Sequence, residues 1–309
     1  MYLSDEISRK ALALGKLTLG MTTHAGSGHP STSLSLAHIV TALMYKVMRY
    51  DPQNPWNPGS DRLILSEGHA VPIVYAAYAD LQGACGNSPE EKQILSTENL
   101  DSFRQINSPL DGHPNPSAGF PFFDCATGSL GQGLSCACGL AISARLNNIA
   151  KNIFVIIGDS ESREGQIWEA LDFIIDQNLH TIIPIFNCNG AGQTGPVSKQ
   201  QSIAAIDIKL KAWGFHTIVI DGHNPGEILN GFRRARSSTR PSAILAKTVK
   251  GWGVKSLQSG NSHGKPLSEK QLKEAITELD SSISSFSISS THNHRMHPQP
   301  PPHISLSPK

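Results

Sequence analysis

Two apolar segments separated by one amphipathic helix constrain the fold of this chain more than any other feature. Residues 153–158 (IFVIIG) and 181–186 (TIIPIF) are short runs rich in β-branched residues, as in buried strands. Residues 165–178 between them have helical spacing. Strands that alternate with helices of this length form parallel sheets, because a parallel return needs a long crossover. We therefore predict an α/β fold, a parallel sheet with helices on both faces.

The same alternation continues over most of the chain. Further strands are predicted at 63–65, 216–220 and 242–247, and helices at Ser4–Thr23, from Ser31 or Thr32 to Met44, and at 133–148, 227–237 and 267–280. Residues 1–280 are accordingly predicted to form one domain. Residues 281–309 are rich in Ser, Pro and His and lack periodicity, which predicts a disordered tail or a truncated linker.

Composition excludes several classes of function. The 309 residues carry a formal net charge of +1 and have no basic stripe, so nucleic acid is not an expected partner. No apolar run is long enough to cross a membrane, and the N-terminus lacks the apolar core of a signal peptide. The five cysteines form no C-x-x-C pair, which indicates reduced thiols. We expect a cytoplasmic protein.

Oxygen-bearing side chains follow the two central strands. Asp159 comes directly after 153–158, and Asn189 follows the next strand. In an open parallel sheet the carboxyl ends of the strands share one crevice, so these two groups are expected to meet there. A carboxylate and an amide oxygen suit Mg²⁺ or Ca²⁺. Alternatively, both residues simply cap the turns after their strands.

A glycine-rich turn and four histidines add to this crevice. GSLGQG at 128–133 opens a helix, a geometry that presents backbone N–H groups to phosphate. A diphosphate bridged by the metal is therefore an expected ligand. The histidines, each beside a glycine, are His29, His69, His113 and His263. One such histidine is usually structural, but four together indicate proton transfer and binding of a polar substrate.

Taken in order, these motifs resemble those of a known family. The segments SGHP, SEGHA, FRQINS with a following GHP, TGSLGQG, GDSESREGQIWEA, NCNGAGQTG and SHGKPL are similar to the diphosphate-binding half of transketolases over residues 5–280. The most specific part is Gly-Asp with an Asn thirty residues after the Asp, which resembles the thiamine diphosphate signature. The ordered histidines are typical of the transketolase branch.

The resemblance implies roles for individual residues. Mg²⁺ would be bound by the side chains of Asp159 and Asn189 and by the carbonyl oxygen of Ala191. The remaining roles follow the family's motifs. Thiamine diphosphate would contact His69, His263, Gly128, Ser129, Leu130, Gly158, Asp159, Ser160 and Asn189; His29, His113 and His263 would line the sugar channel; and Glu164 would lie at a subunit interface.

The resemblance also implies an activity and a partner. The expected reaction transfers a two-carbon ketol unit from a ketose, or its phosphate, to an aldose. Nothing after residue 280 resembles the pyrimidine-binding domain, so we expect a separate C-terminal transketolase subunit, in a dimer or heterotetramer. Two departures from the family are Ser160 in place of glycine and Ala191 in place of a larger aliphatic residue. The alternatives are a non-catalytic, cofactor-binding fragment of an interrupted gene and a subunit like 1-deoxyxylulose-5-phosphate synthase.

Overall fold

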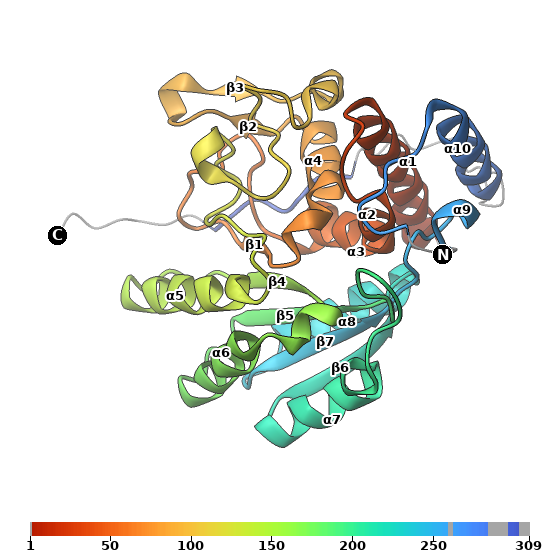
Figure 1. Ribbon diagram of the computed structural model, residues 1–309. Helices are drawn as coiled ribbons and strands as arrows, with labels where there is room; N and C mark the ends of the chain where they lie inside the picture. Colours follow the sequence, from red (N-terminus) through yellow and green to blue (C-terminus); the bar gives the residue numbers. More distant parts are fainter. Residues whose placement is uncertain (1, 259–261, 284–295, 303–309) are drawn as a thin grey trace.

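The computed structural model describes residues 2–258, 262–283 and 296–302, and its centre is a five-stranded parallel sheet (Figure 1). The strands lie in the order β1-β4-β5-β7-β6. Their bounds are Arg62–Leu65 (β1), Ile153–Gly158 (β4), Ile182–Cys188 (β5), His216–Asp221 (β6) and Ser242–Lys247 (β7). A separate antiparallel pair comprises Ala84–Cys85 (β2) and Gln93–Ile94 (β3). The predicted parallel sheet is confirmed, because β1, β4, β5, β6 and β7 pair only in parallel.

Helices cover both faces of this sheet, as predicted. Side chains alternate along β4: Phe154 and Ile156 belong to one buried cluster, whereas Val155 and Ile157 belong to another. The first cluster includes residues of α1 (Tyr2–His24), α3 (Ala37–Ala42), α4 (Val71–Asp80) and α8 (Pro225–Arg236). The second includes residues of α5 (Gln132–Leu146), α6 (Gly165–Asp176) and α7 (Ile203–Trp213). This burial on two sides explains why β4 is apolar throughout and why β5 is apolar as far as Phe186.

A third, smaller cluster joins the two ends of the domain. It contains residues of α1, α2 (Pro30–Ser35), α9 (Lys255–Gln258) and α10 (Glu269–Ile283). Lys16 of α1 forms an ion pair with Asp280 of α10 at 2.6 Å. Residues 262–268, which include His263, precede α10, and the Ser31 hydroxyl of α2 donates to the Ser262 carbonyl at 3.2 Å. This bond holds the segment near the start of α2.

The second predicted helix differs from the observed structure. It divides into α2, α3 and a π-helical turn at Leu43–Val47. His29 occupies the N-cap position and α2 begins at Pro30, so the predicted helix start at Ser31 or Thr32, with one of these residues as its cap, is wrong. Proline favours the first helical position because it has no N–H to satisfy there. The helix α7 was missed, although Ser202 caps it and Ile206 and Leu210 bury one face.

The tail prediction falls mostly outside the described residues. The helix α10 continues to Ile283, past the predicted boundary at 280. Within the tail, Met296–Pro302 is described, and the Tyr50 N–H donates to the Gln299 carbonyl at 2.8 Å. Met296 is buried. The domain boundary and the disorder of the tail stay predictions.

Two expectations from composition concern the whole chain. All five cysteines are unpaired thiols. Within the described ranges, no helix combines the length and the apolar character that crossing a membrane requires.

Candidate functional site

Three neighbouring strands end beside one small cavity. β4, β5 and β7 are adjacent in the sheet, and the residues that follow them line this cavity: Asp159 after β4, Asn189 after β5 and Lys250 after β7. Their closeness is a consequence of sheet topology, since the carboxyl ends of parallel strands point to the same edge. The lining also includes Gly158, Ser160, Leu130, Ala191, His69 and His263.

Asp159 is the central carboxylate of the cavity. Its side chain accepts hydrogen bonds from the backbone N–H groups of Ser160 and Gly190, both at 2.6 Å. It is only 2% exposed. Burial raises the pKa of Asp159 to about 6, against the effect of these hydrogen bonds. The ammonium of Lys250 in the same cavity also lowers the pKa of Asp159, but burial is the larger effect, so the ionised form is poorly solvated.

A hard divalent cation fits these residues. Asn189 lies beside Asp159 in the cavity lining, and its side-chain oxygen accepts from the Ala191 N–H at 3.0 Å. Carboxylate, amide and carbonyl oxygens are the ligands that Mg²⁺ and Ca²⁺ prefer, and a cation would offset the buried charge of Asp159. Over the described residues, no group of three or more His, Cys, Asp or Glu could hold a metal. Of the three expected ligands, the side chains of Asp159 and Asn189 and the Ala191 carbonyl, Asp159 is the one that belongs to these residue types. The metal site therefore stays a prediction.

Three of the four predicted histidines form a compact cluster. The ring centroids of His29 lie 4.9 Å from those of His69 and of His263, and the latter two are 5.1 Å apart. The Nδ1 atom of His29 is buried without a hydrogen-bond partner in the described structure. A buried polar atom without a partner costs free energy, so its position in this cluster is suited to a bound polar group.

These imidazoles are neutral at neutral pH. Burial, with repulsion from neighbouring cationic groups, lowers the pKa of His29 to about 4 and that of His263 to about 4. The pKa of His69 also falls well below its usual range through burial. A neutral imidazole offers one N–H donor and one acceptor nitrogen, a combination that matches hydroxyl groups. The cluster is therefore suited to exchange protons with a polyhydroxyl ligand.

His113 packs against the glycine-rich turn, and it lies near enough to His29 and His69 to lower the pKa of both imidazoles. A Cβ atom added at Gly128 would lie 2.9 Å from Cδ2 of His113, and Gly128 has φ of +140°. Both the backbone conformation and the ring thus require glycine at this position. Within the turn, Leu130 lines the cavity, whereas Ser129 is exposed and outside the lining.

Glu164 lies outside the cavity. It occupies the N-cap position of α6 without a side-chain capping bond, and it is exposed. Its Cβ would lie 2.8 Å from a Cβ added at Gly131. This position on the surface beside the glycine-rich turn is compatible with the expected interface role, which stays a prediction.

The sequence reasoning missed two acidic residues of the site. Glu67 is 2% exposed and accepts from the Asn187 amide at 2.9 Å. Glu161 is 1% exposed and accepts from the Gly131 and Gly158 N–H groups. Burial raises the pKa of both carboxyls. Glu67 follows a predicted strand, just as Asp159 does, so the same reasoning could have found it.

Lys250 and Gln201 were also missed. The ammonium of Lys250 lies 3.2 Å from Nδ1 of His263 and donates to the Gly192 carbonyl at 3.0 Å. The buried Gln201 amide donates to the Ser160 carbonyl at 2.7 Å. Lys250 follows the predicted strand β7, so the reasoning from strand ends could have found it. Gln201 precedes a helix that was not predicted, and no feature of the sequence indicated its role.

Comparisons with known proteins agree with this geometry. The family model described as transketolase, thiamine diphosphate binding domain, matches residues 8–299. The crystal structure of transketolase from Campylobacter jejuni has a TM-score of 0.77 at 31% identity, over 89% of this chain and 43% of that one. Fold, site and family model together define a thiamine diphosphate-binding domain.

Sequence relatives identify the family. Human transketolase is 39% identical over 85% of this chain, which spans 40% of the human protein. A 6-deoxy-6-sulfo-D-fructose transketolase subunit from a Clostridium strain is 36% identical over 89% of this chain and 96% of its own length. The chain belongs to the transketolase family and comprises its thiamine diphosphate-binding domain.

Proposed function

We propose that this chain is the diphosphate-binding subunit of a two-chain transketolase, which transfers a two-carbon ketol unit between sugars. The observation that carries the proposal is the convergence of Asp159, Asn189 and the cluster of His29, His69 and His263 at one edge of the sheet. The size of the Clostridium subunit supports the two-chain arrangement, because this chain covers 96% of it.

Some residues of the chain would bind the cofactor and its metal ion, and others would bind the sugar. Thiamine diphosphate, when bound, supplies the carbanion chemistry of ketol transfer. Asp159, Asn189 and the Ala191 carbonyl would hold Mg²⁺, with the glycine-rich turn and Ser160 beside the diphosphate. His29, His113 and His263 would bind sugar hydroxyls and move protons. Because His29 and His263 are neutral, each can accept a proton without first losing one.

A partner subunit would complete the site. We infer that α6 and α7 take part in association, because apolar side chains stay exposed there. Trp168 packs 5.5 Å from Trp213 between ring centroids, and Trp213 is 38% exposed. Ile208 is 68% exposed and Phe173 42% exposed. Apolar groups gathered in this way favour an interface. Concentration-dependent sedimentation at micromolar protein would test this association.

The deciding experiment is a turnover assay with defined components. Xylulose 5-phosphate and ribose 5-phosphate are incubated with thiamine diphosphate and Mg²⁺, first with this chain alone and then with a candidate partner carrying the pyrimidine-binding domain. A second arm uses 6-deoxy-6-sulfo-D-fructose as donor, the sugar in the name of the Clostridium relative. Calorimetry on the same samples measures cofactor binding separately.

The outcomes separate the alternatives. Turnover only in the mixture supports the two-chain transketolase. Cofactor binding without turnover of either donor favours a non-catalytic fragment. A separate arm with pyruvate and glyceraldehyde 3-phosphate tests the synthase-like subunit, which is favoured if 1-deoxyxylulose 5-phosphate forms there. A cytoplasmic location and a role in sugar phosphate metabolism stay proposals of the same kind.

A further inference from the structure

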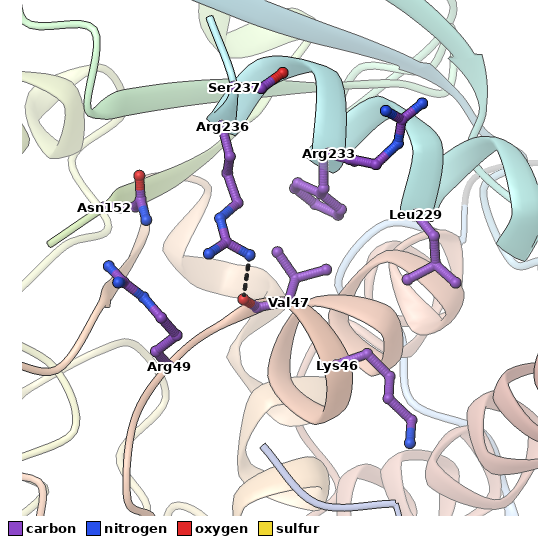
Figure 2. A pocket seen from close by; sticks show the side chains of 9 residues that line it. Lys46, Val47, Arg49, Asn152, Leu229, Arg233, Arg236 and Ser237 are labelled. Atoms are coloured by element: carbon purple, nitrogen blue, oxygen red, sulfur yellow. Dashed lines mark hydrogen bonds between the residues drawn. The ribbon is translucent and has the colours of Figure 1, made fainter. Parts of the chain in front are cut away.

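A second pocket lies at the other edge of the sheet, where the strands begin. Its volume is about 490 Å³, within the range of small-molecule sites of roughly 300–1,000 Å³. Figure 2 shows it between α8, the segment from Lys46 to Arg49, and Asn152 immediately before β4. No residue that lines it also lines the candidate active site.

The pocket concentrates positive charge. Four lining side chains are cationic and none is acidic; the cations are Lys46, Arg49, Arg233 and Arg236. Asp61 forms an ion pair with Arg49 at 2.9 Å. In the part of the chain that the structure describes, the other three cations have no salt bridge. An anionic ligand would supply the missing counter-charge.

Two of the guanidinium groups are held in place without using all their donors. Arg236 Nη1 donates to the Val47 carbonyl at 3.0 Å, a neutral acceptor. Arg49 is fixed by Asp61 through Nε at 3.2 Å and Nη2 at 2.9 Å. In Figure 2 the Arg236 guanidinium points to the Val47 carbonyl, and the Arg49 guanidinium extends toward Asn152. Fixed planar donors of this kind match phosphate geometry and lose little entropy on binding.

The rest of the pocket indicates the kind of molecule. Val47, Leu229 and Phe232 supply apolar surface beside the cations, which suits the organic part of a phosphate ester. The chain's own tail cannot supply acidic side chains, because residues 281–309 contain no Asp or Glu. Arginines in the last turn of a helix also interact favourably with the helix dipole. Arg234 has the same place in α8 without lining the pocket, and it therefore serves as the comparison for Arg236.

We propose that this pocket binds a phosphoryl group between Arg49 and Arg236, either as a phosphate monoester or as free phosphate. Lys46 and Arg233 lie on the flanks and add long-range attraction. The site is separate from the proposed transketolase activity, and its failure or success leaves that proposal untouched.

Titrations of the full chain test this site. Inorganic phosphate and glycerol 3-phosphate are added at fixed ionic strength, and the side-chain NMR signals of Asn152 and Arg236 are followed. We expect saturable shifts, with Arg236→Gln weakening binding at least about tenfold, since each charge-assisted hydrogen bond contributes this much. Arg234→Gln, the matched control, should change affinity less than about twofold. Arg236→Lys is a second variant that keeps the charge and should bind with intermediate affinity.

The results decide both the site and the ligand. Tighter binding of glycerol 3-phosphate assigns the pocket to a monoester, and equal binding assigns it to free phosphate. Equal weakening in Arg234→Gln would mean non-specific attraction and overturn the proposal. Unchanged affinity in Arg236→Gln, or no saturation below about 10 mM, would overturn it as well.

Discussion

The carboxylate of Glu161 accepts a hydrogen bond from the backbone N–H of Gly131 at 2.7 Å, across thirty residues of sequence. The same carboxylate accepts from the Gly158 N–H at 2.9 Å and from the Ser66 hydroxyl. One buried side chain thus joins the glycine-rich turn to the end of β4, where Asp159 begins the next loop. The relative position of these two loops depends on Glu161.

Replacing Glu161 with glutamine should separate these loops. The amide NH₂ would face an N–H donor in place of an acceptor oxygen, which leaves a buried donor unpaired at a cost of about 1–3 kcal/mol. We expect that loss in the free energy of unfolding measured with urea, together with weaker thiamine diphosphate binding. Glu169→Gln on the exposed face of α6 is the control and should be near neutral. Equal stability of both variants would contradict the joining role.

Replacing Asp159 with alanine should abolish the Mg²⁺ dependence of cofactor binding. Asp159 is the one carboxylate expected to bind the ion, and its loss should weaken thiamine diphosphate binding at least about tenfold. Calorimetric titrations with Mg²⁺ and with EDTA measure the effect. If the variant binds the cofactor as tightly as the unaltered chain and still responds to Mg²⁺, the metal assignment is wrong.

Two glycines of α5 should respond oppositely to alanine. A Cβ at Gly133 would lie 2.7 Å from the side chain of Ser66 and 2.9 Å from its Cα, whereas a Cβ at Gly139 would meet nothing within 4 Å. Gly133→Ala should destabilise the protein by about 1–3 kcal/mol through overpacking. Gly139→Ala should stabilise it by up to about 1 kcal/mol through helix propensity. Urea unfolding of both variants measures the difference, and effects of the same sign would refute the packing of α5 against Ser66.

The buried pair His38 and His223 should make stability depend on pH. His38 is 1% exposed, and its Nδ1 lies 3.4 Å from Nδ1 of His223. Burial lowers the pKa of His38 to about 3 from 6.5. Below about pH 6.5, His38 is therefore protonated in the unfolded chain but not in the folded chain. The free energy of unfolding consequently falls as pH decreases toward 3.

The measurement compares pH 7 with pH 5. Over this interval, proton uptake by His38 in the unfolded chain should lower the free energy of unfolding by about 2 kcal/mol. Between pH 7 and pH 5, His38→Gln should therefore lose about 2 kcal/mol less stability than the unaltered chain. His180→Gln, at an exposed position, is the control for the loss of a histidine. A variant of His38 with the same pH profile as the unaltered chain would show that the imidazole titrates normally.

Much of the fold follows from local sequence. The predicted bounds of the strands 153–158 and 242–247 match the observed ones, because short apolar runs between turn residues have few alternatives. The placement of Asp159 and Asn189 at one edge also follows from strand order in the chain. The division of α2 from α3 does not follow from the sequence, because the same apolar pattern fits both a continuous and an interrupted helix.

The fold class, the family and most of the residue types in the site follow from the order of residues along the chain. Which of these groups meet depends on how the chain packs: the cluster of His29, His69 and His263, and the bond from Glu161 to Gly131, are set by the three-dimensional arrangement. These contacts join segments more than thirty residues apart or from different elements. Their geometry depends on the strand order and on packing between helices, and no local periodicity records either one.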